Sequence, residues 1–116
     1  MKQEIEEPIE GVSIERYAGI AAHLDFEAPS SVTPAGARAR AAVLVDEGIE
    51  LARWERVHAA WQVRIHEEIA RASALPGVPV VERYPVVMRY GAAYAKAKRG
   101  FEEQRAADAD AAKQAP

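Results

Sequence analysis

The chain of 116 residues contains no cysteine, and this absence excludes several kinds of chemistry at once. Without thiols there can be no disulfide framework, no thiolate metal site and no cysteine nucleophile. Proteins that need no disulfides are typical of reducing compartments. The sequence therefore predicts a cytoplasmic location, with a periplasmic location as the alternative.

Long apolar runs are also absent. No apolar stretch approaches the roughly 18 residues that a membrane-spanning helix requires. The first seven residues, MKQEIEE, do not combine a basic stretch with an apolar one, as a secretory signal would. We therefore expect neither a membrane span nor a secretory signal.

The chain likewise has no motif typical of a self-contained active site. It lacks a serine in a glycine-rich elbow, spaced catalytic carboxylates and a glycine-rich phosphate-binding loop. Its 15 basic and 18 acidic residues give a net charge of −3, without the basic excess of a nucleic-acid binder. These absences favour an interaction protein over an enzyme, with no cofactor and with nucleic acid disfavoured as a partner.

Four stretches with apolar residues at helical spacing predict an all-α fold. The first helix begins after Ser13, a good N-cap, and lasts about four turns. The second begins at Thr33-Pro34 and ends at Gly48, because proline suits a first helical position and glycine a C-terminal cap. The third covers about residues 51–73, and the fourth starts at Pro85. We expect a compact four-helix bundle. Its helices could be orthogonal or could run up and down.

The composition divides the chain into three parts. Residues 1–11 are acidic and lack helical periodicity, which predicts a flexible lead-in. Residues 12–104 are predicted to form the helical bundle. Residues 75–79 end the third helix, and residues 80–84 fit a helical turn before Pro85 better than the alternative, a short strand without a partner. Residues 105–116 are rich in Ala, Asp, Glu and Gln, which predicts a disordered tail.

Several acidic and histidine residues allow alternative interpretations. Glu55 and His58 form a Glu-x-x-His motif, which could bind a metal ion if a second subunit completed the site. The alternative places His58 at the core boundary and Glu55 in solvent. Residues 66–68, His-Glu-Glu, fit a solvated helix face. Residues 46–47, Asp-Glu, oppose a helix dipole and are expected to pair with Arg53 or Arg56.

Trp54 and Trp61 are seven residues apart on one face of the third helix. Tryptophans at this spacing are typical of a core, where their indole N–H groups need hydrogen-bond acceptors. The alternative is a groove for an apolar small ligand between these two rings and the fourth helix.

The fourth helix interleaves aromatic and basic side chains, the residue types favoured at protein interface hot spots. We predict that they bind a protein partner, which can be a second copy in a homodimer. The aromatic residues could instead fill the core, and the same mixture could bind single-stranded nucleic acid. The predicted partner-binding residues are Arg83, Tyr84, Arg89, Tyr90, Tyr94, Lys98 and Phe101.

Three segments carry a resemblance to a known group of proteins: GVSIERY at 11–17, LVDEGI at 44–49 and WERVHAAW at 54–61. Together they resemble small uncharacterised helical domains of proteobacteria that are associated with secretion and toxin gene clusters. The resemblance covers about residues 11–65 and rests on capping and core positions, and the segment 75–85 departs from it. It implies a bacterial accessory or adaptor protein and assigns no catalytic residue.

Overall fold

The computed structural model describes residues 7–28, 33–74, 77 and 83–114. This part of the chain contains four α-helices and no strand: α2 (Ile14–Glu27), α3 (Pro34–Glu47), α4 (Leu51–Ala72) and α6 (Pro85–Gln114). The prediction of an all-α, four-helix fold is confirmed. None of the described helices is both long enough and apolar enough to cross a membrane.

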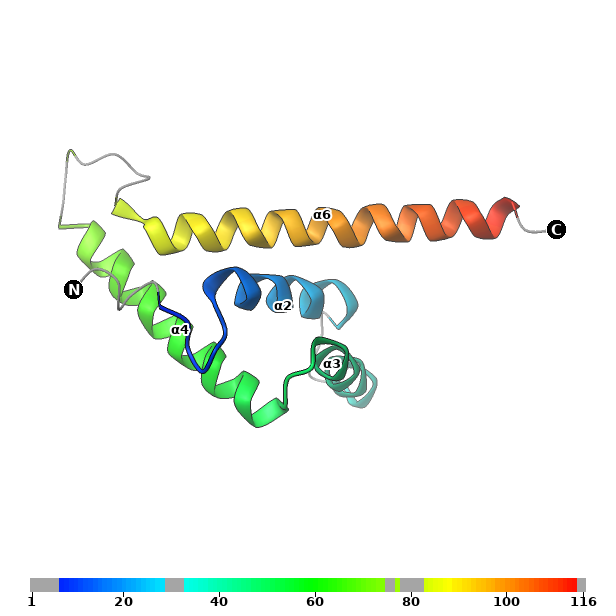
Figure 1. Cartoon of the computed structure of the whole chain (residues 1–116), viewed down its shortest axis with the longest axis horizontal. Coiled ribbons are helices and arrows are strands. Elements are labelled where there is room, and N and C mark those ends of the chain that lie inside the picture. Colours follow the sequence, from blue (N-terminus) through cyan, green and yellow to red (C-terminus); the bar gives the residue numbers. More distant parts are fainter. Residues whose placement is uncertain (1–6, 29–32, 75–76, 78–82, 115–116) are drawn as a thin grey trace.

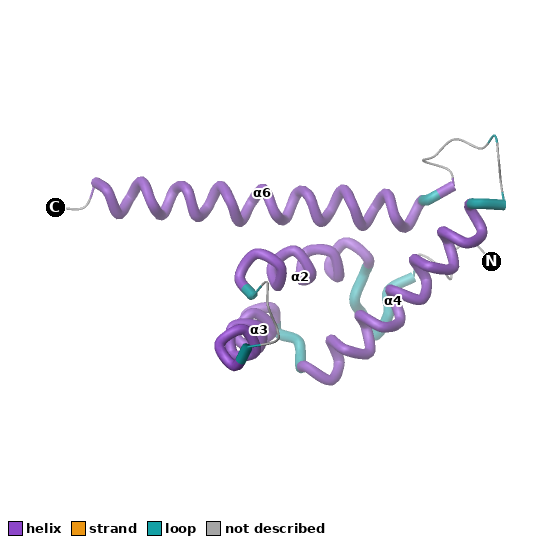
Figure 2. Tube along the Cα trace, turned by 180° about the vertical axis from the view of Figure 1, so that it is seen from behind, coloured by secondary structure: helices purple, strands orange, loops and turns teal. Residues whose placement is uncertain are grey.

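Helices α3 and α4 run across the pair formed by α2 and α6, so the four helices do not run up and down in one bundle. Helices α2 and α6 lie side by side and run in the same direction, whereas α3 is seen nearly end-on and α4 crosses obliquely (Figure 1). Seen from behind, α6 extends well past the end of α2 (Figure 2). The molecule is therefore longer than the predicted compact bundle, with extents of 60 × 30 × 25 Å.

The helix ends follow the capping signals in the sequence. The Ser13 side chain accepts a hydrogen bond from the backbone N–H of Arg16 at 3.1 Å, and Thr33 accepts one from Gly36 at 2.9 Å. Gly48 ends α3 with a φ of 71°, the left-handed conformation that glycine adopts without steric cost. Local chemistry thus determines where α2 and α3 begin and where α3 ends.

The core lies where α2, α4 and the start of α6 meet. Its largest fully buried side chains include Trp54 and Trp61 of α4, Tyr17 of α2 and Val86 of α6. Tyr17 stacks against both indole rings, with centroids 5.4 Å and 6.3 Å away. Three large aromatic rings therefore pack α2 against α4.

Glu68 of α4 is buried, only 3% exposed, although residues 66–68 were predicted to lie on a solvated face. That prediction holds for His66 and Glu67, which are exposed, and is wrong for Glu68. The two carboxylate oxygens of Glu68 accept hydrogen bonds from the backbone N–H groups of Val86 and Val87, both at 2.9 Å. Glu68 therefore caps the positive N-terminal end of α6.

The predicted acidic lead-in makes specific contacts from Glu7 onward. Ile9 packs against the core, and the Glu10 carboxylate forms a two-point ion pair with Arg56, with both N–O distances 2.9 Å. Arg53 also binds this segment, by donating to the Glu10 carbonyl oxygen. The expected pairing of residues 46–47 with these two arginines is therefore wrong: Glu47 instead binds His23 at 2.8 Å.

At the other end, α6 remains helical to Gln114, where a disordered tail was predicted from residue 105. The helix propensity of Ala, Glu, Gln and Lys outweighs the absence of apolar residues there. The predictions of a flexible lead-in, a helical turn and a disordered tail also cover residues 1–6, 80–82 and 115–116. These residues lie outside the described part of the chain.

Candidate interaction surface

Most of the aromatic and basic side chains predicted to bind a partner contact α2 of the same chain. Arg89 binds the Glu15 carboxylate through two nitrogens, at 2.6 Å and 2.8 Å. The Tyr94 hydroxyl donates to Asp25 at 2.5 Å. Because these groups already bind one another, they join α6 to α2.

The rings of Tyr90 and Phe101 are also used within the chain. The Tyr90 ring contacts the Tyr17 ring in a tilted arrangement, with centroids 5.6 Å apart. Phe101 stacks on His23 and Phe26, with centroids 4.7 Å and 5.7 Å away. These contacts fit the alternative prediction, in which the aromatic residues pack within the chain, better than the prediction that they face a partner.

The remaining members of the predicted set lie at two separate places. Arg83 and Tyr84 are half-buried and directly precede α6, which begins at Pro85. Lys98 is exposed and lines a cavity of about 190 Å³ together with Phe26 and Tyr94. The predicted set is therefore divided between the α2–α6 contact and two separate surface positions.

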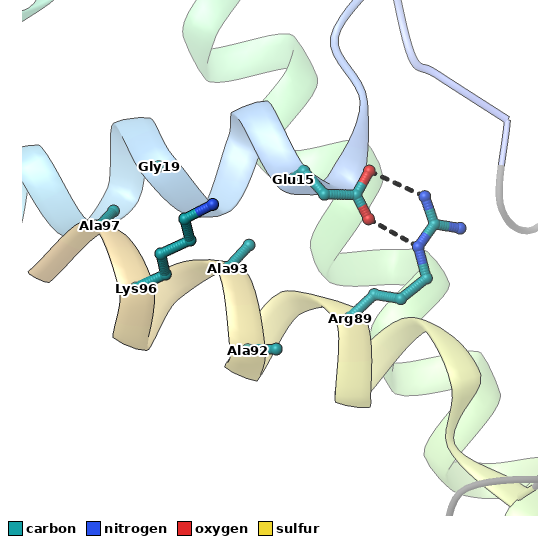
Figure 3. Close-up of a pocket in the computed structure, with 7 residues that line it drawn as sticks. All are labelled: Glu15, Gly19, Arg89, Ala92, Ala93, Lys96 and Ala97. Carbon is teal, nitrogen blue, oxygen red and sulfur yellow. Dashed lines mark hydrogen bonds and ion pairs between the residues drawn. The ribbon is translucent and has the colours of Figure 1, made fainter.

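A surface groove that the sequence did not reveal lies between α2 and α6 (Figure 3). Its volume is about 590 Å³, and it is open to solvent. Small residues line it, namely Gly19 of α2 and Ala92, Ala93 and Ala97 of α6. A Cβ atom added at Gly19 would meet no atom within 4 Å. Small residues facing each other between two helices thus leave room for a further helix to approach closely.

The two ends of this groove differ in charge. At one end Glu15 and Arg89 neutralise each other, and hydrogen bonding from Arg89 lowers the pKa of Glu15 against the opposing effect of desolvation. Toward the other end the Lys96 side chain reaches toward α2 (Figure 3). Lys96 is exposed, so the groove offers a cationic group beside an apolar floor.

The two tryptophans lie in the core but differ in hydrogen bonding. Trp61 is 0% exposed, and its indole N–H donates to the Val12 carbonyl oxygen at 3.2 Å. The predicted apolar ligand groove between both rings and the fourth helix is therefore not formed at Trp61. Trp54 is 1% exposed, and its indole N–H has no partner among the described residues.

Glu55 and His58 line different cavities, although the sequence motif places them one turn apart. Glu55 lies beside Arg40 in a cavity of about 380 Å³ between α3 and α4. His58 lines a separate cavity, and its Nδ1 is 2.8 Å from the Tyr17 hydroxyl oxygen. Within the residues that the structure describes, no group of three or more His, Cys, Asp or Glu side chains could hold a metal ion.

Comparison of the chain with models of known protein families, with curated proteins and with solved structures finds no match. The resemblance to helical domains of proteobacteria therefore stays a prediction, and the surfaces described above carry the functional argument.

Proposed function

We propose that this chain is a protein–protein interaction module that associates with a second copy of itself through α6. The observation that carries the proposal is the distal half of α6, defined as residues 102–114. Every residue of the distal half is exposed, and it extends past the end of α2 (Figures 1 and 2). A helical segment of this length is marginally stable in water on its own, so packing against a partner would stabilise it.

The charge distribution along α6 selects an antiparallel pairing. Residues 85–101 of α6, its proximal half, contain four basic residues and no acid, whereas the distal half contains four acids and two bases. In an antiparallel dimer with two-fold symmetry, the acidic distal half of one copy faces the basic proximal half of the other. A parallel pairing would instead bring like charges together.

The shape of the surface favours the same arrangement. The face of α6 that lines the groove continues through small and polar residues at helical spacing, namely Gly100, Gln104, Ala107 and Ala111. In the antiparallel pair, Ala107 and Ala111 of one copy would enter the groove floored by Ala93 and Gly19 of the other. Glu103 would then lie near Lys96 of the second copy.

A charge exchange between Lys96 and Glu103 tests this pairing. We expect Lys96→Glu to raise the dimer dissociation constant about tenfold, because the symmetric interface contains the contact twice. The double variant Lys96→Glu/Glu103→Lys should restore most of the lost affinity. Sedimentation velocity of the full chain over a concentration series measures all three constants.

Lys98→Glu is the matched control, since Lys98 is also an exposed lysine of α6 but lines a different cavity. It should change the dissociation constant much less than Lys96→Glu. A parent chain that stays monomeric throughout the series would refute self-association. A dimer that Lys96→Glu leaves intact, or that the double variant fails to restore, would refute this interface.

A further inference from the structure

A second surface lies on α3 and α4, away from the groove between α2 and α6. The open cavity of about 380 Å³ between α3 and α4, here named the α3–α4 cavity, is lined by nine residues, none of which lines that groove. In Figure 1, α2 lies between α3 and α6. A partner bound in the α3–α4 cavity would therefore leave the proposed dimer surface free.

Apolar side chains form most of the α3–α4 cavity. Leu44 and Ile49 line it and are buried, whereas Val45 and Leu51 line it and are 78% and 53% exposed. Val45 is the most exposed large apolar side chain among the described residues. A single exposed apolar side chain is ordinary on a protein surface, but two that border the same apolar recess are typical of an interaction site.

The shape of this apolar surface fits a helix. Ala37, Ala41 and Val45 are four residues apart in sequence, so they follow one side of α3 for about 12 Å. Leu51 of α4 lines the same cavity, so side chains from two helices border it. The short alanine side chains allow a third helix to approach closely, and an amphipathic helix in an apolar groove is a recurring mode of recognition.

The exposed charges of the α3–α4 cavity are negative. Glu50 and Glu55 line it and are exposed, and neither carboxylate forms an ion pair within the described part of the chain. The Arg56 guanidinium, which interacts with the charge of Glu50, is already bonded to Glu10 through two nitrogens. Both glutamates are therefore available to a cationic partner.

Among the described residues, Arg40 is the only basic one that lines the α3–α4 cavity, and it is half-buried. It also lines a neighbouring cavity that contains His58, where burial and then the positive charge of Arg40 lower the pKa of His58. Because His58 does not line the α3–α4 cavity, the single positive charge is shared between two cavities. Two exposed carboxylates thus outweigh one half-buried guanidinium.

We propose that the α3–α4 cavity binds a cationic amphipathic helix of a different protein, whose apolar side chains contact Val45 and Leu51 and whose lysine or arginine side chains lie beside Glu50 and Glu55. A second copy of this chain is a poorer occupant, because its own basic helical segment, residues 85–101, packs against α2. The inference goes beyond the proposed dimer, since it assigns a second partner to a separate surface.

Titration of the full chain with a blocked helical peptide of Ala, Leu and Lys, about four turns long, tests the proposal. In ¹H–¹³C spectra the methyl signals of Val45 should shift in a saturable way, and those of Val63, an exposed valine of α4 outside the cavity, should not. Val45→Ser and Glu55→Lys should each weaken binding about tenfold, by removing an apolar contact and by reversing a charge. Val63→Ser and Glu67→Lys are the matched controls and should bind as the parent does, because both residues are exposed outside the cavity.

Four results would overturn the proposal: no saturable shift at Val45, unchanged binding by Val45→Ser or Glu55→Lys, equal losses in the control variants, or equal affinity for the same peptide with Glu in place of Lys. Loss of self-association in Val45→Ser would also overturn it, by assigning the cavity to a second copy. Val45 and Glu55 are exposed, so both variants should fold. Lys96→Glu should bind the peptide normally, which separates this test from that of the dimer.

Discussion

The two halves of α6 belong to one continuous helix but are stabilised in different ways. The proximal half begins at a buried carboxylate cap and packs Val86, Tyr90 and Phe101 toward α2 and the core. In the distal half, Arg105 contacts Phe26 and Glu27, and all residues are exposed. Tertiary packing stabilises the first half, whereas the second depends largely on intrinsic helix propensity. The difference leaves the distal half available for a partner.

The largest effect should come from removing packing in the proximal half. Tyr90→Ala deletes a half-buried ring that stacks on Tyr94 and contacts Tyr17 in a tilted arrangement. We expect it to lower the free energy of unfolding by about 2 kcal/mol. Urea denaturation followed by circular dichroism measures the change. Tyr94→Phe, which keeps the ring and loses one exposed hydrogen bond, should cost much less; equal losses would show that ring packing is not what holds the proximal half.

A smaller effect should follow from weakening the cap of α6. Glu68→Gln leaves only one side-chain oxygen for the N–H groups of Val86 and Val87, and it removes the negative charge from the helix N-terminus. We expect a loss of about 1–2 kcal/mol in the free energy of unfolding. The neighbouring Glu67→Gln is the control, because Glu67 is exposed. Matching denaturation midpoints for both variants would contradict the capping role.

These contacts also show which parts of the structure the sequence can predict. Caps such as Ser13, Thr33 and Gly48 act within a few residues, so the helix starts and the left-handed turn follow from local patterns. The partners of Glu68 and Arg89 depend on which helices meet and in which direction. Helices α2 and α6 are parallel neighbours in space, but two other helices separate them in the sequence. Helical periodicity alone therefore cannot reveal that they pair.

The candidate sites likewise combine features that the sequence predicts with features that only the fold provides. Burial of Trp54 and Trp61 was predictable from their spacing on one helical face. Only the fold, however, provides a carbonyl oxygen for the Trp61 N–H and none in the described chain for that of Trp54. Likewise, Gly19 and Ala93 are ordinary helix residues in the sequence and become a groove only when α2 and α6 meet.

An alanine-to-glycine substitution made once in each half of α6 compares the two halves most directly, although its effect on the free energy of unfolding is the smallest of the three. Glycine in place of an exposed helical alanine costs about 1 kcal/mol of helix free energy wherever it is placed. At concentrations where the chain is monomeric, Ala92→Gly should lower the global free energy of unfolding by that amount, because the proximal half is helical only when the bundle is folded. Ala107→Gly should leave the global value unchanged and reduce only the helical signal, because the distal half can fray while the core stays intact. Equal global losses would mean that the two halves unfold as one unit, and the distal half would then not be a separately available surface.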